Sequence, residues 1–216
     1  MELYTKREEN INTLTHWIGT ILVSLGSGCL ITLSILSGST TKLVAILIYS
    51  ISMMMLYSAS TLYHHEQNEN VKQKLKIVDH CSIYFLIAGT YTPFLLINLQ
   101  GLIGTIMLII LWSMALGGTI AKVFFFNKFK KVSLAVYLVM GWIVVFAIKP
   151  LIETTNVTGL IFLVLGGLFY SGGTYFYAKK NKEFSHAIWH VFVLLGTIAH
   201  FFAVLFGCLF PIKTIF

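Results

Sequence analysis

The sequence predicts an all-α membrane protein, a bundle of seven transmembrane helices with its N-terminus in the cytoplasm and its C-terminus outside the cell. Three observations predict this fold class. Of 216 residues, 57% are hydrophobic and 11% are charged, against roughly 25% charged residues in a soluble domain. The apolar residues gather in seven long windows, and the basic residues gather in alternate connections between them. A single soluble core cannot bury this much apolar surface, whereas lipid can accept it.

Each window approaches the length that a membrane-spanning helix requires, about 20 mostly apolar residues. In order, the windows cover residues 17–36, 43–63, 81–99, 102–121, 132–148, 157–178 and 184–210. The fifth is the shortest. Pro93 should kink the third helix, because proline removes a backbone donor and clashes with the preceding turn. The connections are brief and we find no repeat or linker, so we expect one domain over residues 1–216.

The orientation follows from the basic residues, which membrane proteins concentrate in cytoplasmic connections. The N-terminal side of the membrane receives 12 of them: Lys6, Arg7, Lys72, Lys74, Lys76, Lys122, Lys128, Lys130, Lys131, Lys179, Lys180 and Lys182. The other side receives 3: Lys42, Lys149 and Lys213. This imbalance predicts a cytoplasmic N-terminus and an external C-terminus.

The charge pattern also limits the partners and the location. The formal net charge is +7, but the basic residues lie in short connections, where anionic lipid headgroups attract them. We therefore expect membrane lipids, and no nucleic acid, as partners. The first residues, MELYTKREEN, carry both signs of charge and precede an apolar run too long for a signal-peptide core. The chain is therefore expected to be a multi-pass protein of the cell membrane.

Ionisable residues at membrane depth are costly and mark functional sites. Once the topology is set, five of them fall at the cytoplasmic ends of their helices. His16 begins the first helix, His64 closes the second, Asp79 opens the third, and His186 and His190 open the seventh. A metal site assembled from several helices requires this convergence.

The spacing of these residues strengthens the metal hypothesis. His186 and His190 are four residues apart, on one helix face and about 6 Å apart along the axis. With His64 as a third ligand and a water molecule, they would form the open coordination of catalytic zinc. Ser60 lies one turn before His64 on the same face. By the same spacing, Glu9, Asn12 and His16 form one polar stripe leading into the first helix.

Simpler interpretations remain open for these residues. Two histidines four apart can be interfacial imidazoles without a metal, and Asp79 can be a solvated carboxylate that favours a helix N-terminus. His65 and His80 should point elsewhere and are left unassigned. His200 lies about 21 Å from His186 along the axis, too deep to share an ion, and is expected to be a hydrogen-bonded core residue.

The order of these motifs resembles the hemolysin III family. It consists of Glu9-x-x-Asn12-x-x-Thr15-His16, Ser60-x-x-x-His64, Asp79, IAGTYTPF at 87–94, and His186-x-x-x-His190. That family is the bacterial branch related to the adiponectin and progestin receptors, in a wider group with alkaline ceramidases. The resemblance implies a seven-helix bundle with Zn²⁺ in its cytoplasmic half. It also implies zinc ligands at His64, His186 and His190, an aspartate at Asp79 that contacts the metal-bound water, and a nearby serine at Ser60.

Three functions are compatible with this pattern. The first is a zinc-dependent hydrolase of a lipid amide or ester, in which Asp79 orients or deprotonates the water and Ser60 assists by hydrogen bonding. The second is a non-enzymatic sensor or regulator of membrane fluidity with structural zinc. The third is a pore-forming cytolysin, which ranks last because the sequence shows no amphipathic insertion segment and a zinc site has no evident use in lysis.

Overall fold

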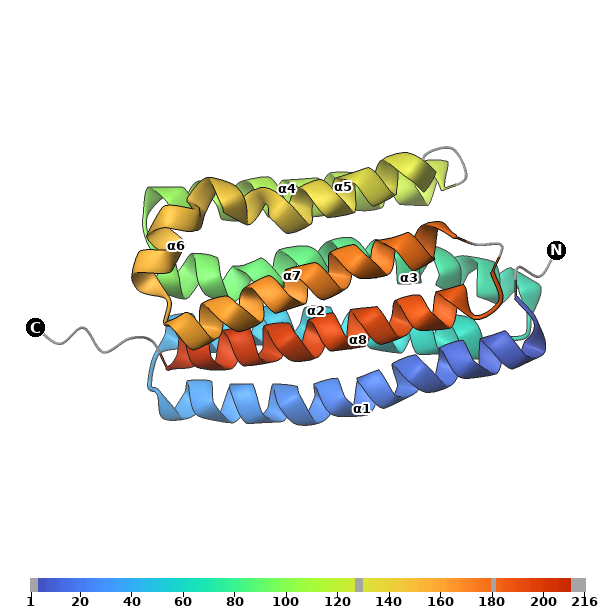
Figure 1. Ribbon diagram of the computed structural model, residues 1–216, viewed down its shortest axis with the longest axis horizontal. Helices are drawn as coiled ribbons and strands as arrows, with labels where there is room; N and C mark the ends of the chain where they lie inside the picture. Colours follow the sequence, from blue (N-terminus) through green and yellow to red (C-terminus); the bar gives the residue numbers. More distant parts are fainter. Residues whose placement is uncertain (1–3, 127–129, 180–181, 211–216) are drawn as a thin grey trace, which may run out of the picture.

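The computed structural model describes residues 4–126, 130–179 and 182–210, and these residues form helices joined by short connections (Figure 1). The helices are, in order, α1 (Lys6–Leu36), α2 (Thr40–His65), α3 (Glu69–Pro93), η1 (Phe94–Asn98), α4 (Leu102–Phe125), α5 (Lys130–Trp142), η2 (Ile143–Ala147), α6 (Ile148–Thr154), α7 (Val157–Ala178), α8 (Ser185–Val204) and η3 (Leu205–Leu209).

These elements provide seven helices that are long and apolar enough to cross a membrane, as the hydropathy windows predict. The segments α5, η2 and α6 together supply one of them, Val132–Thr154. The spans run roughly side by side, with α1 along one edge of the bundle and α4 and α5 along the opposite edge (Figure 1). The most extensive packing joins α7 to α8, α2 to α3, and α1 to α2. The protein is therefore a multi-pass integral membrane protein.

Two helices begin well before their apolar windows. The first begins at Lys6 rather than at residue 17, and the third begins at Glu69 rather than at residue 81. Both extensions carry charged residues, which a hydropathy window rejects although they are good helix formers. Side-chain caps also mark these true starts, because Thr5 accepts a hydrogen bond from the Glu8 backbone and Asn68 accepts from the Asn70 and Val71 backbone.

The two prolines inside spans leave those spans continuous. After Pro93, the third span continues as the π-helical segment η1, so the disturbance takes the form of a wider turn. The fifth span ends at Thr154 rather than at residue 148, because the 3₁₀ segment η2 leads directly into α6. Pro150 lies in the first turn of α6, where a missing backbone donor costs no helical hydrogen bond.

Glycines in α7 allow α8 to pack closely, but only on one face. A Cβ at Gly166 would clash with Cδ2 and Nε2 of His200, and a Cβ at Gly173 would lie 2.7 Å from Cε3 of Trp189. A Cβ at Gly167 would meet no atom within 4 Å. Gly166 and Gly173 therefore make room for two large side chains of α8.

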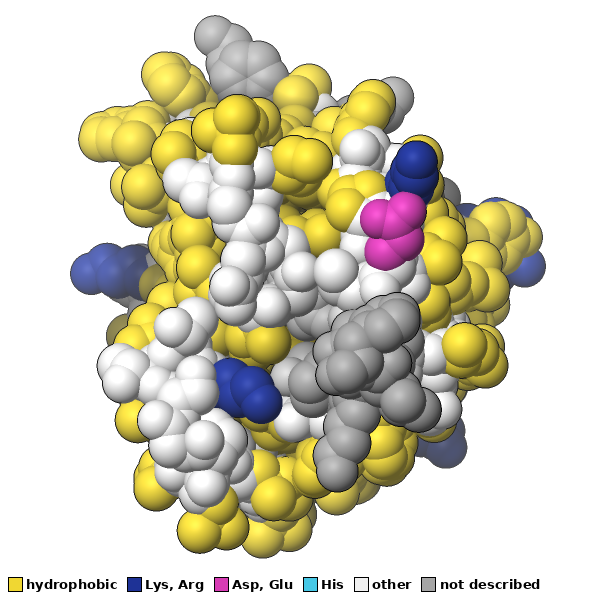
Figure 2. Space-filling view, turned by 90° about the vertical axis from the view of Figure 1, so that its left-hand side faces the viewer, with side chains coloured by type: hydrophobic (Ala, Val, Ile, Leu, Met, Phe, Trp, Pro, Cys, Tyr) yellow, Lys and Arg dark blue, Asp and Glu magenta, His cyan; other side chains and the backbone are white. Residues whose placement is uncertain are grey.

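The orientation of the bundle in the membrane remains a prediction. Figure 2 shows the end at which α1 ends and α2 begins; its surface is largely hydrophobic or uncharged, with few charged side chains. The sequence assigns this end Lys42, Lys149 and Lys213. Of the basic residues used to predict the orientation, Lys128, Lys180 and Lys213 lie outside the described residues, as does the C-terminal Phe216.

Reporter fusions to each end of the full-length chain test the orientation. We expect a reporter before Met1 to be active in the cytoplasm and a reporter after Phe216 to be active outside, because of the basic imbalance. Fluorescence of a fused fluorescent protein and activity of a fused alkaline phosphatase measure the two locations. Both ends on the same side would contradict the seven-span topology.

Candidate metal centre

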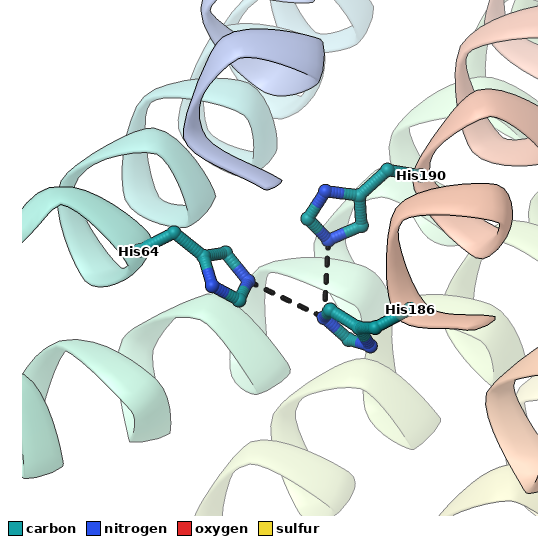
Figure 3. Close-up of side chains that lie close together, drawn as sticks. All are labelled: His64, His186 and His190. Atoms are coloured by element: carbon teal, nitrogen blue, oxygen red, sulfur yellow. Dashed lines mark hydrogen bonds between the residues drawn. The ribbon is translucent and has the colours of Figure 1, made fainter. Parts of the chain in front are cut away.

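Three histidines from two helices converge at the end of the bundle where α1 and α8 begin. Among the residues that the structure describes, His64, His186 and His190 offer ring nitrogens that all lie within 4.8 Å of one another. Nε2 of His186 lies 3.3 Å from Nε2 of His64 and 3.1 Å from Nε2 of His190. Figure 3 shows the three rings turned toward a common point, with His64 on α2 and the other two on α8.

This geometry fits a tetrahedral zinc site. Zinc binds histidine nitrogen at about 2.0–2.1 Å, so two ligand nitrogens of a tetrahedral site lie roughly 3.3 Å apart. The two printed Nε2 separations agree with that spacing. The donor set of three imidazoles also suits zinc, and it leaves a fourth position free for water or substrate.

A carboxylate on α1 orients His64, the first of these histidines. Oε2 of Glu9 lies 2.5 Å from Nδ1 of His64, and Oε1 of Glu9 lies 2.9 Å from Nζ of Lys72. Because a carboxylate only accepts, Nδ1 of His64 donates the hydrogen and Nε2 keeps its lone pair. A carboxylate behind a histidine ligand is the usual way in which a protein fixes the tautomer of a zinc-binding ring.

Helix α1 also orients a second histidine, His190. Nδ1 of His190 lies 3.3 Å from the backbone carbonyl oxygen of Asn12 and 3.2 Å from Oγ1 of Thr15. The carbonyl only accepts, so Nδ1 of His190 donates and its Nε2 also presents a lone pair. His64 and His190 therefore both direct a lone pair toward Nε2 of His186, an arrangement that a cation between the rings would stabilise.

A hydrogen bond joins the start of α1 to the residue that precedes α8. Thr5 and Glu8 form a reciprocal cap, and Oε1 of Glu8 accepts a hydrogen bond of 3.1 Å from the backbone N–H of Phe184. Phe184 has a left-handed backbone (φ 59°) and immediately precedes α8. Because Glu8 holds this residue, α1 and α8 approach each other where Glu9 and His186 contribute to the site.

Tyr4 covers the third histidine. Its ring stacks on that of His186 with centroids 4.9 Å apart. Burial raises the pKa of the Tyr4 phenol well above its usual range, with smaller contributions from Tyr177 and the Glu9 and Asp79 carboxylates. Tyr4 is therefore a neutral aromatic cover over the site at physiological pH.

Asp79 lies inside α3 and is buried, with 8% of its surface exposed. The simpler interpretation of Asp79 as a solvated residue at a helix N-terminus is therefore wrong. Its Oδ2 lies 3.4 Å from Nδ1 of His80, which also lies 2.8 Å from the carbonyl oxygen of Lys76. Asp79 lines the same cavity as His186 and His190.

Several polar groups around the cluster have no hydrogen-bond partner within the described part of the chain. His16 stacks on His190 with ring centroids 3.6 Å apart and an interplanar angle of 21°. Both ring nitrogens of His16, both side-chain atoms of Asn12 and the Ser60 hydroxyl are buried without a hydrogen bond to any described residue. His16 and Ser60 also line the cavity. Buried polar groups of this kind are usually paired, so they indicate a place for a polar ligand or water.

The cavity extends from this cluster into the membrane-spanning part of the bundle. It has a volume of about 220 Å³, and its wall is mostly apolar. It reaches His200 on α8 and passes between α5 and α7. There, three of its lining residues, Trp142, Val145 and Val164, are also 44–55% exposed on the outer surface of the bundle. These three residues therefore lie both in the cavity wall and on the outer surface of the bundle.

Comparison with known proteins identifies the family. The family model described as "Haemolysin-III related" matches residues 4–201. A protein named "Hemolysin-3 homolog" from Bacillus subtilis is 47% identical over 95% of this chain and 97% of its own length. The human "Monocyte to macrophage differentiation factor" is 32% identical over 91% of this chain and 83% of its own length. The chain belongs to the haemolysin-III related family.

Sequence reasoning missed several residues of this haemolysin-III site. It assigned no role to Tyr4, Lys72 or His80, yet they lie against His186, Glu9 and Asp79, respectively. Lys72 is seven residues before Asp79, a helical spacing that places both on one face of α3. That signal was hidden because the predicted third helix began only near Asp79, after Lys72.

A change at Glu9 tests the orienting role of this carboxylate. We expect Glu9→Gln to lower zinc affinity roughly 10- to 100-fold, because the amide binds Nδ1 of His64 more weakly and no longer fixes the ring as a carboxylate does. Competition with a chelator of known affinity measures the change. Glu153→Gln, an exposed carboxylate on α6, is the control. Equal zinc affinity of wild type and Glu9→Gln would contradict this role.

Proposed function

We propose that this haemolysin-III protein is a zinc-dependent hydrolase that acts on a lipid amide or ester in the membrane. One observation carries the proposal: three histidine nitrogens with zinc-like spacing lie at the head of an apolar cavity that Asp79 and Ser60 also line. The cavity wall suits an acyl chain, and the polar groups at its head suit an amide or ester carbonyl.

The ligands and the neighbouring residues divide the chemistry between them. His64, His186 and His190 hold the ion, and Glu9 and the Asn12 carbonyl fix two of their tautomers. Zinc bound there would polarise a carbonyl and lower the pKa of a coordinated water toward 7. Asp79 accepts a proton as the water oxygen attacks the carbonyl carbon. Ser60 donates a hydrogen bond to the carbonyl oxygen, because its buried hydroxyl is not engaged elsewhere in the described residues.

The reaction is completed by proton transfer to the leaving group. The bond between the carbonyl carbon and the amide nitrogen or ester oxygen breaks. The leaving amine or alcohol takes the proton that Asp79 accepted, and the other product is a free fatty acid. The test is release of fatty acid from ceramide and from phospholipid in proteoliposomes that contain the purified, zinc-loaded protein. No release from either class would contradict the proposal.

A second candidate is a non-catalytic sensor or regulator of membrane fluidity, in which zinc clamps the bundle. The observation that favours it is the joining of three helices at one point, with ligands on α2 and α8 and their hydrogen-bond partners on α1. A lipidomic comparison separates the two candidates. The hydrolase predicts that cells carrying His186→Ala accumulate a specific lipid amide or ester, whereas the clamp predicts no substrate that accumulates.

A further inference from the structure

A second polar group lies deep in the cavity. His200 is on α8, ten residues after His190, and therefore about 15 Å farther along the helix axis. It lines the same cavity as His186 and His190 and is 9% exposed. The nearby wall is otherwise largely apolar, with Leu160 and Val164 among the residues that form it. An imidazole at this depth is therefore unusual for a surface that only contacts hydrocarbon.

The contacts of His200 define its tautomer. Its Nε2 lies 3.2 Å from the carbonyl oxygen of Leu163. Because a carbonyl only accepts, Nε2 carries the hydrogen, and Nδ1 of the neutral ring is an acceptor. The Cδ2–Nε2 edge packs against Gly166, where a Cβ would clash with it. The glycine of α7 and the Leu163 carbonyl thus hold the ring in one orientation, with Nδ1 on the opposite edge.

The Nδ1 acceptor is buried and has no hydrogen-bond partner among the described residues. Hydroxyls on neighbouring residues are engaged with one another. Oγ1 of Thr197 lies 2.9 Å from the Tyr57 hydroxyl, which donates to it, and 2.7 Å from the Tyr170 hydroxyl. The Tyr170 ring contacts that of His200, with centroids 5.3 Å apart. A buried acceptor without a donor calls for a ligand or a water.

We propose that Nδ1 of His200 binds a hydroxyl group carried on the chain of a lipid whose polar head lies at the histidine cluster. This proposal rests on the proposed function, because it places the head of the lipid there. An extended carbon chain covers 15 Å in roughly twelve bonds. The site therefore selects lipids with a hydroxyl about twelve carbons from the head, and His200 is a specificity-determining residue.

Binding of hydroxylated fatty acids to the purified, zinc-loaded protein tests this. The probes are stearate, 12-hydroxystearate and 2-hydroxystearate, each competing with a fluorescent fatty acid. We expect wild type to bind 12-hydroxystearate roughly three- to tenfold more tightly than stearate, the usual contribution of one hydrogen bond. 2-Hydroxystearate should gain no such preference from His200, because its hydroxyl lies beside the head.

Two variants distinguish the roles of the two ring nitrogens of His200. His200→Gln places an amide where Nε2 lies and removes the acceptor at Nδ1, so the preference for 12-hydroxystearate should fall to about one while stearate affinity is kept. His200→Asn places an amide where Nδ1 lies and should keep part of the preference. The ratio between the two probes in one variant cancels any partial loss of folded protein. Comparing that ratio with the wild-type ratio cancels the difference in their partitioning into detergent.

The outcomes are distinguishable from those of the proposed function. Equal binding of stearate and 12-hydroxystearate by wild type, or a preference that His200→Gln retains, overturns the hydroxyl site and leaves the hydrolase proposal standing. In the first case a water satisfies Nδ1. Binding of no fatty acid overturns the hydroxyl site, and release of fatty acid from ceramide or phospholipid decides the hydrolase proposal separately. Fatty acid binding with the expected ratios but without hydrolysis supports the hydroxyl site and contradicts only the hydrolase.

Discussion

Protein in which alanine replaces both His186 and His190 is expected to purify without zinc, whereas wild type should hold about one zinc per chain. The reason is that α8 supplies two of the three nitrogens, and the remaining ligand, His64, cannot hold the ion alone. His64→Ala should also remove most of the metal. Mass spectrometry of the metal content per chain, after exchange into chelator-free buffer, measures the effect.

Two histidines serve as controls for this experiment. His200 lies on the same helix but is absent from the metal-binding group, and His65 is adjacent to His64 but exposed. Alanine at either position should leave the zinc content unchanged. Zinc retained at the wild-type level in the His186/His190 double variant would end the metal hypothesis, and with it the hydrolase mechanism.

Asp79→Asn is expected to keep the zinc but to lower lipid hydrolysis by roughly 10²–10⁴-fold, the usual weight of general base catalysis. The amide has nearly the shape of the carboxylate and can still meet His80, but it cannot accept the proton. His64→Ala should abolish hydrolysis by the different route of losing the metal. Zinc content and release of free fatty acid are measured together in wild type and both variants.

Glu69→Gln is the matched control for Asp79→Asn, because Glu69 is an exposed carboxylate on the same helix. It should change neither quantity. If Asp79→Asn remains fully active while wild type hydrolyses lipid, Asp79 is not the base. If wild type releases no fatty acid from any ceramide or phospholipid offered, the clamp of the second candidate becomes the preferred function.

The spans could be predicted from sequence because hydropathy depends on composition, which each window carries in full. Their ends could not. The extensions at the starts of α1 and α3 hold charged residues that are helical because of caps and of contacts with other helices. In α1, Glu8 is stabilised by the distant Phe184 N–H. A partner so far away in the sequence is invisible to a local window.

The candidate site, too, could be predicted from sequence only in part. Alternating topology brings His64, His186 and His190 to one end of the bundle, so their convergence follows from sequence. The hydrogen-bond partners of these histidines do not follow from sequence. The stripe of Glu9 and Asn12 is visible, but pairing Glu9 with His64 depends on how α1 is rotated about its axis. Asn12 contributes through its backbone carbonyl, a group that every residue has and that no sequence pattern can single out.

The exposed residues that line the cavity between α5 and α7 determine which concentration of a lipid ligand governs its binding. Trp142, Val145 and Val164 face both the cavity and the surroundings of the bundle, which in a membrane are acyl chains. Under the proposed function, a lipid substrate would enter there after diffusing in the two dimensions of the membrane. Occupancy of the cavity is then governed by the mole fraction of that lipid among its neighbours, and adding water to the suspension leaves it unchanged.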